Sequence, residues 1–96
     1  MHYTYMLRCG DNSLYTGYTN RLQHRIKMHQ EGKGAKYTRG RGPLKLVYVE
    51  AFETKSEALV REHEIKKMPK SEKEALISKH QEELKKVIDE NGIIIL

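Results

Sequence analysis

One short segment near the N-terminus, LYTGYTNRLQHRIKMH, carries a phenol, a guanidinium and an imidazole that could act together in chemistry. These groups belong to Tyr15, Arg25 and His29. Arg25 and His29 are spaced i, i+4, so on a helix they share one face with the apolar Leu22 and Ile26. Two interpretations are open. One is a boundary arginine beside a core histidine with satisfied hydrogen bonds, and the other is a set of polar groups held in place for a reaction.

A carboxylate raises the same question further along the chain. Glu62 lies within the apolar stripe of a second predicted helix, four residues after Ala58 and three before Ile65. An ionised carboxylate buried there requires a partner or a metal ion. Lys66, at i+4, is one such partner, and a metal cation is the alternative. Several polar residues that interrupt apolar stripes in one small chain favour a functional site.

The elements that must position these groups begin with a hairpin and a helix. HYTYMLRC (2–9) is rich in β-branched and aromatic residues, and LYTGYT is a returning strand after the turn Gly10–Ser13. The helix is expected to be capped by Thr19 or Asn20 and to end near Gly32. The first two strands should therefore pair antiparallel, with the helix following them.

A glycine-rich basic loop, residues 32–43, comes next, with one helical turn expected around 35–38. It leads into LKLVYVEAF (44–52), the strongest strand signal in the chain. The apolar side chains of this strand fall on both of its faces. We therefore expect the strand to be covered on both sides.

The remaining third of the sequence is predicted to be helical. Thr54 and Glu57 form a capping box that opens a helix ending at about Lys67, before a proline. Ser71 and Glu74 repeat that pattern and predict a last helix over about 71–91.

The resulting order, β-β-α-β-α-α, excludes a doubly wound parallel sheet. It predicts a small α+β fold in which a three-stranded antiparallel or mixed sheet is flanked by helices. We expect one domain over residues 1–96, with the chemically interesting residues within about 3–70.

Composition limits the partners and the compartment. Lys and Arg number 18 against 13 Asp and Glu, a net charge of +5 that favours a polyanionic partner. Cys9 is the only cysteine, so no intrachain disulfide can form, and we expect a cytoplasmic protein. No segment approaches the length of a membrane span, and the apolar tail at 93–96 is far too short for one.

The motifs resemble one known family. YTY at Tyr3–Tyr5, YTG at Tyr15–Gly17, then Arg25, His29 and Glu62 follow the order and spacing of the GIY-YIG nuclease domain. The loop GKGAKYTRGRGPLKLV is similar to that of its small stand-alone bacterial members. Tyr3 replaces the leading glycine of the first motif, and threonines replace both isoleucines.

The resemblance implies a metal-dependent endonuclease that hydrolyses phosphodiester bonds in nucleic acid, DNA favoured over RNA, with a place in DNA repair or recombination. Glu62 would bind one Mg²⁺ or Mn²⁺, since Mg²⁺ needs only one or two carboxylates beside waters and substrate phosphates. Arg25 would stabilise the charge on the phosphate. One chain carries one such site, so we expect a monomer, while double-strand cutting would need a dimer or two visits.

The resemblance assigns activation of water to a tyrosine, and either Tyr5 or Tyr15 could serve. Tyr5 is the favoured base, with Tyr15 orienting water or phosphate; nearby positive charge would have to lower the pKa of the phenol. His29 would position a tyrosine hydroxyl or carry its proton away. Gly17 would allow close approach of backbone or substrate.

Cationic residues of the glycine-rich loop are candidate nucleic-acid contacts. Lys33, Lys36, Arg39 and Arg41 could bind phosphates, and Tyr37 could stack on a base. The alternative is a solvated loop whose charges serve solubility alone.

The two tyrosines place a geometric demand on the hairpin. Tyr5 and Tyr15 must point to the same face, and a two-residue turn at Asp11–Asn12 would pair Tyr5 with Tyr18 and send Tyr15 to the other face. The nuclease interpretation therefore predicts a three- or five-residue loop, or a bulge.

Two other functions are open. The family's asparagine beyond the glutamate helix has no counterpart in MPKSEKEALI, so its role is vacant or passes to Ser71 or Lys70. A non-catalytic nucleic-acid-binding module with the nuclease fold would fit that gap. The other candidate is a protein-interaction domain that uses the last helix and the apolar tail.

Overall fold

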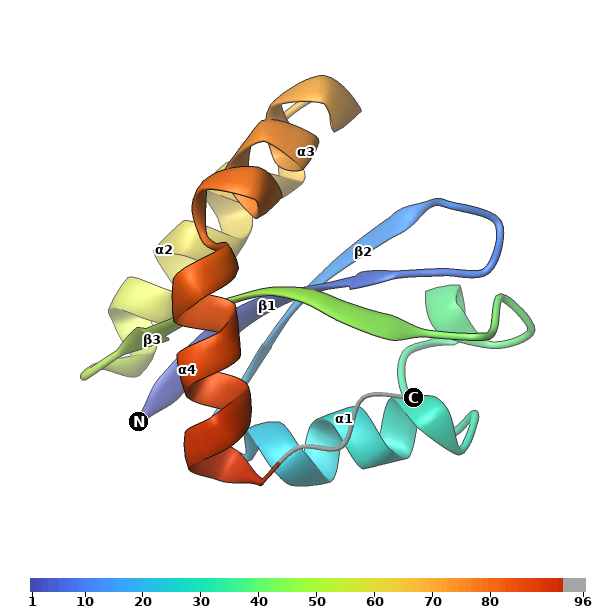
Figure 1. Ribbon diagram of the computed structural model, residues 1–96, viewed down its shortest axis with the longest axis horizontal. Helices are drawn as coiled ribbons and strands as arrows, with labels where there is room; N and C mark the ends of the chain where they lie inside the picture. Colours follow the sequence, from blue (N-terminus) through green and yellow to red (C-terminus); the bar gives the residue numbers. More distant parts are fainter. Residues whose placement is uncertain (93–96) are drawn as a thin grey trace.

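The computed structural model describes residues 1–92, and the apolar tail at 93–96 lies outside the described residues. Within them the order is β-β-α-β-α-α-α, which confirms the predicted α+β class (Figure 1). The elements are β1 His2–Arg8, β2 Leu14–Thr19, α1 Leu22–Gln30, the 3₁₀ turn η1 Lys36–Thr38, β3 Lys45–Phe52, α2 Lys55–Lys66, α3 Lys70–Lys79 and α4 Gln81–Asn91. None of the helices in this part of the chain is long and apolar enough to cross a bilayer.

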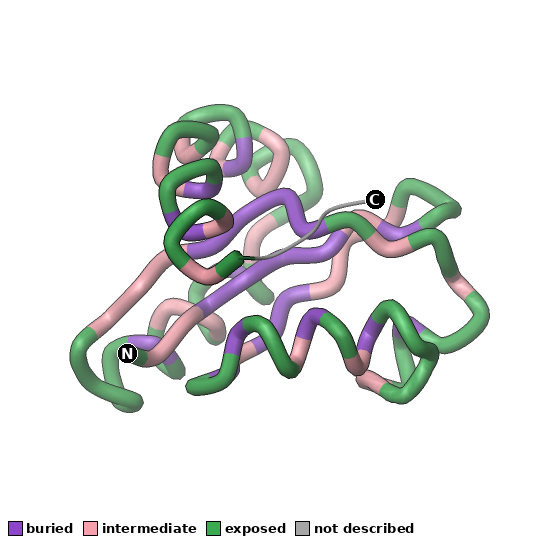
Figure 2. The backbone as a smooth tube through the Cα atoms, turned by 60° about the horizontal axis from the view of Figure 1, so that its bottom comes forward, coloured by how far each residue is buried: buried purple, intermediate pink, exposed green. Residues whose placement is uncertain are grey.

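The sheet is antiparallel throughout, with β1 in the centre between β2 and β3. Each face of the sheet carries its own apolar core, and buried positions follow the strands and the inner sides of the helices (Figure 2). On one face Tyr5 and Leu7 pack with residues of α1 and α4. On the other, Met6 and Tyr48 pack with residues of α2 and α3. The strand β2 is therefore a sheet edge between two helical layers.

The hairpin has the register that the two tyrosines require. Tyr5 lies opposite Gly17 and Leu7 lies opposite Tyr15, so both tyrosines are on the same face. The Cys9 N–H donates to Ser13 O at 2.9 Å, and the Asn12 N–H donates to Cys9 O at 2.9 Å, with Asn12 at φ 69°. This is a three-residue loop built on a turn and a left-handed residue. It confirms the predicted loop length.

The third strand is covered on both faces, as its sequence predicted. A register shift between Met6 and Leu7 on β1 marks a bulge against β3. Leu46 packs in the core that includes α1 and α4, whereas Val47 and Tyr48 pack in the core that includes α2 and α3. The bulge lets two successive side chains of β3 enter the same core.

The predicted capping residues are right for α2 and wrong for α1 and α3. Thr54 caps α2 and accepts a hydrogen bond from the Glu57 N–H at 3.2 Å, which confirms the capping box. Helix α1 has Arg21 at its N-cap instead of Thr19 or Asn20. The Thr19 hydroxyl still accepts from the Arg21 N–H at 3.0 Å, so it supports the turn before the helix without capping it.

The single last helix expected over 71–91 is two helices that meet at His80. The break has a packing reason, because Ile77 of α3 is buried on one face of the sheet and Leu84 of α4 on the other. A straight helix could not cover both faces. The His80 ring lies edge-on against Tyr48, with ring centroids 5.2 Å apart.

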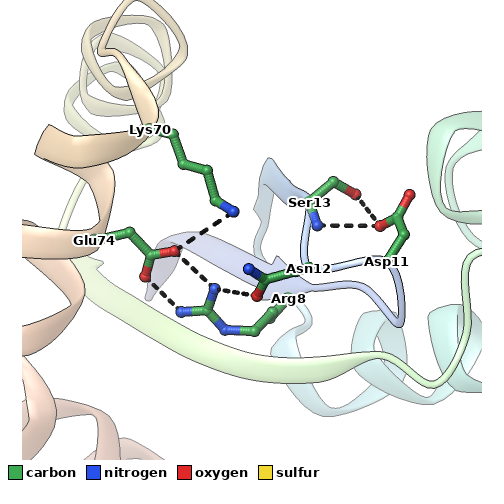
Figure 3. A network of polar contacts seen from close by, with 6 residues as sticks. All are labelled: Arg8, Asp11, Asn12, Ser13, Lys70 and Glu74. Atoms are coloured by element: carbon green, nitrogen blue, oxygen red, sulfur yellow. Dashed lines mark hydrogen bonds and ion pairs between the residues drawn. The ribbon is translucent and has the colours of Figure 1, made fainter.

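Glu74 does not serve as a capping residue, because Pro69 is the N-cap of α3. Its carboxylate instead accepts two hydrogen bonds from the Arg8 guanidinium, at 2.6 and 2.8 Å (Figure 3). Arg8 also donates to Asn12 Oδ1 at 3.0 Å, and the Lys70 ammonium lies 3.9 Å from Glu74. This bidentate pair ties the end of β1 to α3.

Replacing Glu74 by Gln should weaken this link. The hydrogen bonds from Arg8 lower the pKa of the Glu74 carboxyl, so its contribution to stability is present above about pH 4.3 and is lost as pH falls through the lowered value. Because the pair is partly exposed, we expect a loss of about 0.5–1 kcal/mol in urea unfolding at pH 7. Glu72→Gln on the same helix is the matched control. Equal losses for the two variants would contradict the assignment.

Candidate active site

Tyr5 is the most enclosed of the predicted site residues, with a side chain that is 0% exposed. Its ring lies across Gly17 of the neighbouring strand. A Cβ built on Gly17 would stand 2.6 Å from the Tyr5 Oη and 2.7 Å from Cζ, distances that real Cβ atoms do not reach. Gly17 therefore makes room for a phenol of the protein itself, where the sequence suggested backbone or substrate.

The Tyr5 hydroxyl is one member of a buried chain of hydrogen bonds. Its oxygen lies 2.8 Å from Nε2 of His29, which is 1% exposed. His29 Nδ1 lies 3.1 Å from Thr38 Oγ1, and the Thr38 hydroxyl donates to Ala35 O at 2.9 Å. The Thr38 hydroxyl has one proton, and it donates this proton to Ala35 O. Its oxygen must therefore accept a hydrogen bond from His29 Nδ1–H. A neutral His29 then accepts the Tyr5 proton on Nε2.

Arg25 extends this chain toward the solvent. Its Nε–H donates to the Tyr5 Oη at 3.4 Å, which is a long hydrogen bond. All the bonds then point one way, from Arg25 through Tyr5, His29 and Thr38 to Ala35, an arrangement in which each bond polarises the next. The terminal NH₂ groups of Arg25 are not used in this chain.

Burial sets the protonation states of the chain. It raises the pKa of Tyr5 to about 12, with Arg25 opposing this shift and the charges of Tyr15 and Glu62 adding to it. Burial, followed by the charge of Arg25, lowers the pKa of His29 to about 4. At pH 7 the phenol is protonated and the imidazole is neutral. Arg25 does lower the pKa of Tyr5, but desolvation of the phenol outweighs this effect.

Tyr15 stands at the more open side of the same cluster and is only half-buried. Its ring centroid lies 6.3 Å from that of Tyr5 and 5.4 Å from that of His29. It also stacks with Tyr37 at 6.0 Å and 27°. Hydrogen bonding to Tyr5 is the main cause of the raised pKa of the Arg25 guanidinium, and Tyr15 adds to it, so both phenols lie near one arginine.

The glycine-rich loop is held against the site by contacts that sequence reasoning missed. A Cβ on Gly34 would stand 2.2 Å from the His29 Nδ1, so this glycine lets the loop cover the imidazole. Arg41 forms an ion pair with Asp11 at 2.6 Å, and its guanidinium carbon lies 4.4 Å from the centroid of the Tyr37 ring. The Arg41 side chain is therefore engaged in contacts within the protein. The other cationic side chains of the loop are exposed: Lys33, Lys36 and Arg39.

Glu62 approaches the cluster from the opposite layer. It lies on α2, beneath the other face of the sheet, with a side chain that is 17% exposed. Its charge contributes to the raised pKa of Tyr5, so the two groups lie within electrostatic reach of one another. The predicted partner is present, because the Lys66 ammonium lies 3.1 Å from the carboxylate.

The Glu62 carboxylate suits a hard divalent cation that takes its other ligands from water and from the substrate phosphate. Within residues 1–92 no three His, Cys, Asp or Glu side chains gather to enclose a metal ion. Mg²⁺ is commonly bound through one or two carboxylates, with waters and phosphate oxygens completing its shell. Glu62 alone meets that requirement. Lys70, a candidate for the missing asparagine, lies near Glu74 in the network of Figure 3.

The histidine assignment predicts a specific pH dependence. With a folded pKa of about 4 against about 6.5 when unfolded, His29 contributes stability that is full above pH 6.5 and falls as pH drops toward 4, by on the order of 3 kcal/mol. Unfolding of His29→Gln should lose this dependence relative to the wild type. His24→Gln, exposed on the same helix, is the control. An imidazole ¹⁵N spectrum with Nε2 protonated at pH 7 would contradict the tautomer.

Comparison with known proteins identifies the family and several small relatives. The family model described as the GIY-YIG catalytic domain matches residues 1–75. The UPF0213 protein OB0043 of Oceanobacillus iheyensis is 58% identical over 82 residues, 85% of this chain and 95% of that protein. The UPF0213 protein NP_0776A of Natronomonas pharaonis is 52% identical over 77 residues, 80% of this chain and 91% of that protein. The relatives thus come from archaea as well as bacteria.

Solved structures show the same fold. The solution NMR structure of the UPF0213 protein BH0048 from Bacillus halodurans has 52% sequence identity and a TM-score of 0.57, covering 83% of this chain and 85% of that one. The solution NMR structure of EF2693 from E. faecalis has 41% identity and a TM-score of 0.57, covering 81% and 83%. With its family match and these small relatives, the chain belongs to the GIY-YIG catalytic domain family.

Proposed function

We propose that this protein is a divalent-metal-dependent endonuclease that hydrolyses phosphodiester bonds in nucleic acid, with DNA as the favoured substrate. The proposal is supported by two observations: Arg25 is anchored through Tyr5 and His29, and Glu62 of the opposite layer lies within electrostatic reach of Tyr5. Phosphoryl chemistry needs these groups: a fixed cationic donor for the phosphate and a carboxylate for a cation.

Arg25 is the phosphate-binding residue of the proposal. Its Nε–H is held by Tyr5, so the guanidinium plane is fixed before substrate arrives. A planar fork fixed in advance can bind two phosphate oxygens without first being ordered. Tyr5, His29 and Thr38 act through Arg25 and are positioning residues.

We assign the contact with the attacking water to Tyr15, which reverses the preference for Tyr5. Tyr5 is fully buried and protonated, and its hydroxyl already donates to His29 and accepts from Arg25. Tyr15 is half-buried beside the same arginine. Its hydroxyl can meet both water and phosphate.

Glu62 is the residue that would hold the cation. A divalent ion bound there supplies charge stabilisation for the phosphate and the leaving oxygen. The Lys66 ammonium lies 3.1 Å from this carboxylate and provides the partner that a largely buried charge requires.

The glycine-rich loop would supply the non-specific contacts. Lys33, Lys36 and Arg39 are exposed and can pair with phosphates, and Tyr37, 44% exposed, can stack on a base. Arg41 would instead stabilise the loop, because it packs over the Tyr37 ring and forms an ion pair with Asp11 of the hairpin.

The role of Glu62 is tested by nicking of supercoiled plasmid DNA in Mg²⁺. Glu62→Gln, nearly the same shape without the charge, should lose about a hundredfold or more in rate, because several kcal/mol of metal-dependent stabilisation depend on it. Glu64→Gln, on the same helix, is the control.

Rates that are equal in the wild type and Glu62→Gln would identify a contaminant. If the wild type binds DNA as tightly as Glu62→Gln does, but cleaves none of the single-stranded, duplex, branched and RNA substrates, the protein is a non-catalytic binding module.

The two tyrosines are separated by measuring rate and stability together. Tyr5→Phe leaves His29 Nε2 and Arg25 Nε without their partner, so it should lower stability by about 1–3 kcal/mol as well as slow cleavage. Tyr15→Phe should slow cleavage by about 10²–10⁴ while changing stability little, and should alter the pH profile of the rate. The reverse pattern, with Tyr15→Phe active, would restore Tyr5 as the group that contacts water.

A further inference from the structure

A pocket of about 360 Å³ adjoins the proposed active site and wraps around the exposed edge of β2. Its lining comes from both layers of the fold. The residues are Leu14, Tyr15, Thr16, Tyr37, Lys66 and Lys73. Tyr15 is shared with the active site, so any chain that enters the pocket also passes the proposed catalytic groups.

The hydroxyl of Thr16 is the first sign that the pocket takes a ligand. Thr16 is 4% exposed, and its Oγ1 has no hydrogen-bond partner among residues 1–92. A buried hydroxyl without a partner costs free energy, and valine would have the same shape at no such cost. A polar ligand in the pocket would give this hydroxyl a function.

Two lysines supply the charge of the pocket. Lys66 comes from the end of α2 and Lys73 from α3, and they converge on the same hollow. Lys66 also bridges to Glu62, whereas Lys73 has no ion pair within the described part of the chain. A hydroxyl donor beside two ammonium groups suits a phosphate oxygen.

The remaining wall is aromatic. Tyr15 and Tyr37 stack at 6.0 Å, and Tyr37 is among the exposed large side chains of the protein. A pocket with cations on one side and phenol rings on the other matches a nucleotide, whose phosphate and base differ in the same way.

We propose that this pocket binds a phosphodiester group of the substrate strand that is next to, and distinct from, the one being cleaved, with Thr16 and Lys73 as its principal contacts. The proposal rests on the proposed function, since it takes the strand to run past Tyr15. The strand then crosses the edge of β2 from the glycine-rich loop toward α3.

Metal-free binding measures the pocket separately from cleavage. A fluorescent DNA oligonucleotide is titrated in EDTA at several salt concentrations with wild type, Lys73→Gln and Lys79→Gln. The last variant removes the same charge from an exposed position on the same helix. We expect Lys73→Gln to bind about three- to tenfold more weakly and to lower the slope of log K against log salt by about 1, the loss of one phosphate contact. Lys79→Gln should keep the wild-type slope.

The threonine gives a second signature that a charge effect cannot imitate. Thr16→Val should bind about tenfold more weakly while its thermal unfolding midpoint is unchanged or higher, because the lost hydroxyl has no internal partner. Thr16→Ser should retain most of the affinity. A Thr16→Val variant that binds normally overturns the proposal.

Other outcomes are also decisive. The proposed phosphate site would be overturned if Lys73→Gln and Lys79→Gln had the same slope of log K against log salt, or if the wild type did not bind DNA. Inorganic phosphate that shifts the Thr16 and Lys73 NMR signals as strongly as the oligonucleotide would identify a free-anion site and overturn the strand assignment. If binding behaves as expected but Mg²⁺ produces no cleavage, the nuclease proposal fails while the pocket stands.

Discussion

The packing of one phenol ring over one glycine determines most of the arrangement described above. Tyr5 can reach His29 only because Gly17, directly opposite it in the hairpin, has no side chain. That contact fixes the buried chain from Arg25 to Ala35, and with it the conformation of the loop that covers His29. The chain is stable without ionisation, because burial keeps the phenol protonated and the imidazole neutral. The chain of hydrogen bonds therefore holds the side chains of Arg25, Tyr5 and His29 in fixed relative positions.

The second constraint is that a site assembled from both faces of a sheet must lie at an uncovered edge. Arg25 and Tyr15 belong to the layer of α1, and Glu62 to the layer of α2. The two layers can meet only around an edge of the sheet, and β2 is the edge strand that carries Tyr15. The break at His80 fits this plan, because α4 packs on the face of α1 while α3 packs with α2 on the other face.

Much of this could be predicted from the sequence, for identifiable reasons. Local signals located the strands and the α2 capping box, since alternation and capping depend on neighbouring residues. The hairpin register followed from requiring Tyr5 and Tyr15 on one face. Thr38 and Gly34 were missed because their importance comes from a tertiary contact with His29 that no local pattern encodes. The helix break was missed because the apolar stripe continues through it, and only the two-faced sheet requires the change of direction. The net direction of the Tyr5 pKa could not be predicted, because the sequence reveals nearby charges better than desolvation.

The proposed function requires that residues from the two faces of the sheet serve one reaction. Single-turnover DNA cleavage in Mg²⁺ by Arg25→Ala, Glu62→Gln and the double variant tests it directly. If both groups act on the same phosphate, each single change should slow cleavage by about a hundredfold or more, and the double variant should be little slower than the worse single one. Losses that multiply, or a single variant that cleaves at the wild-type rate, would contradict a shared site.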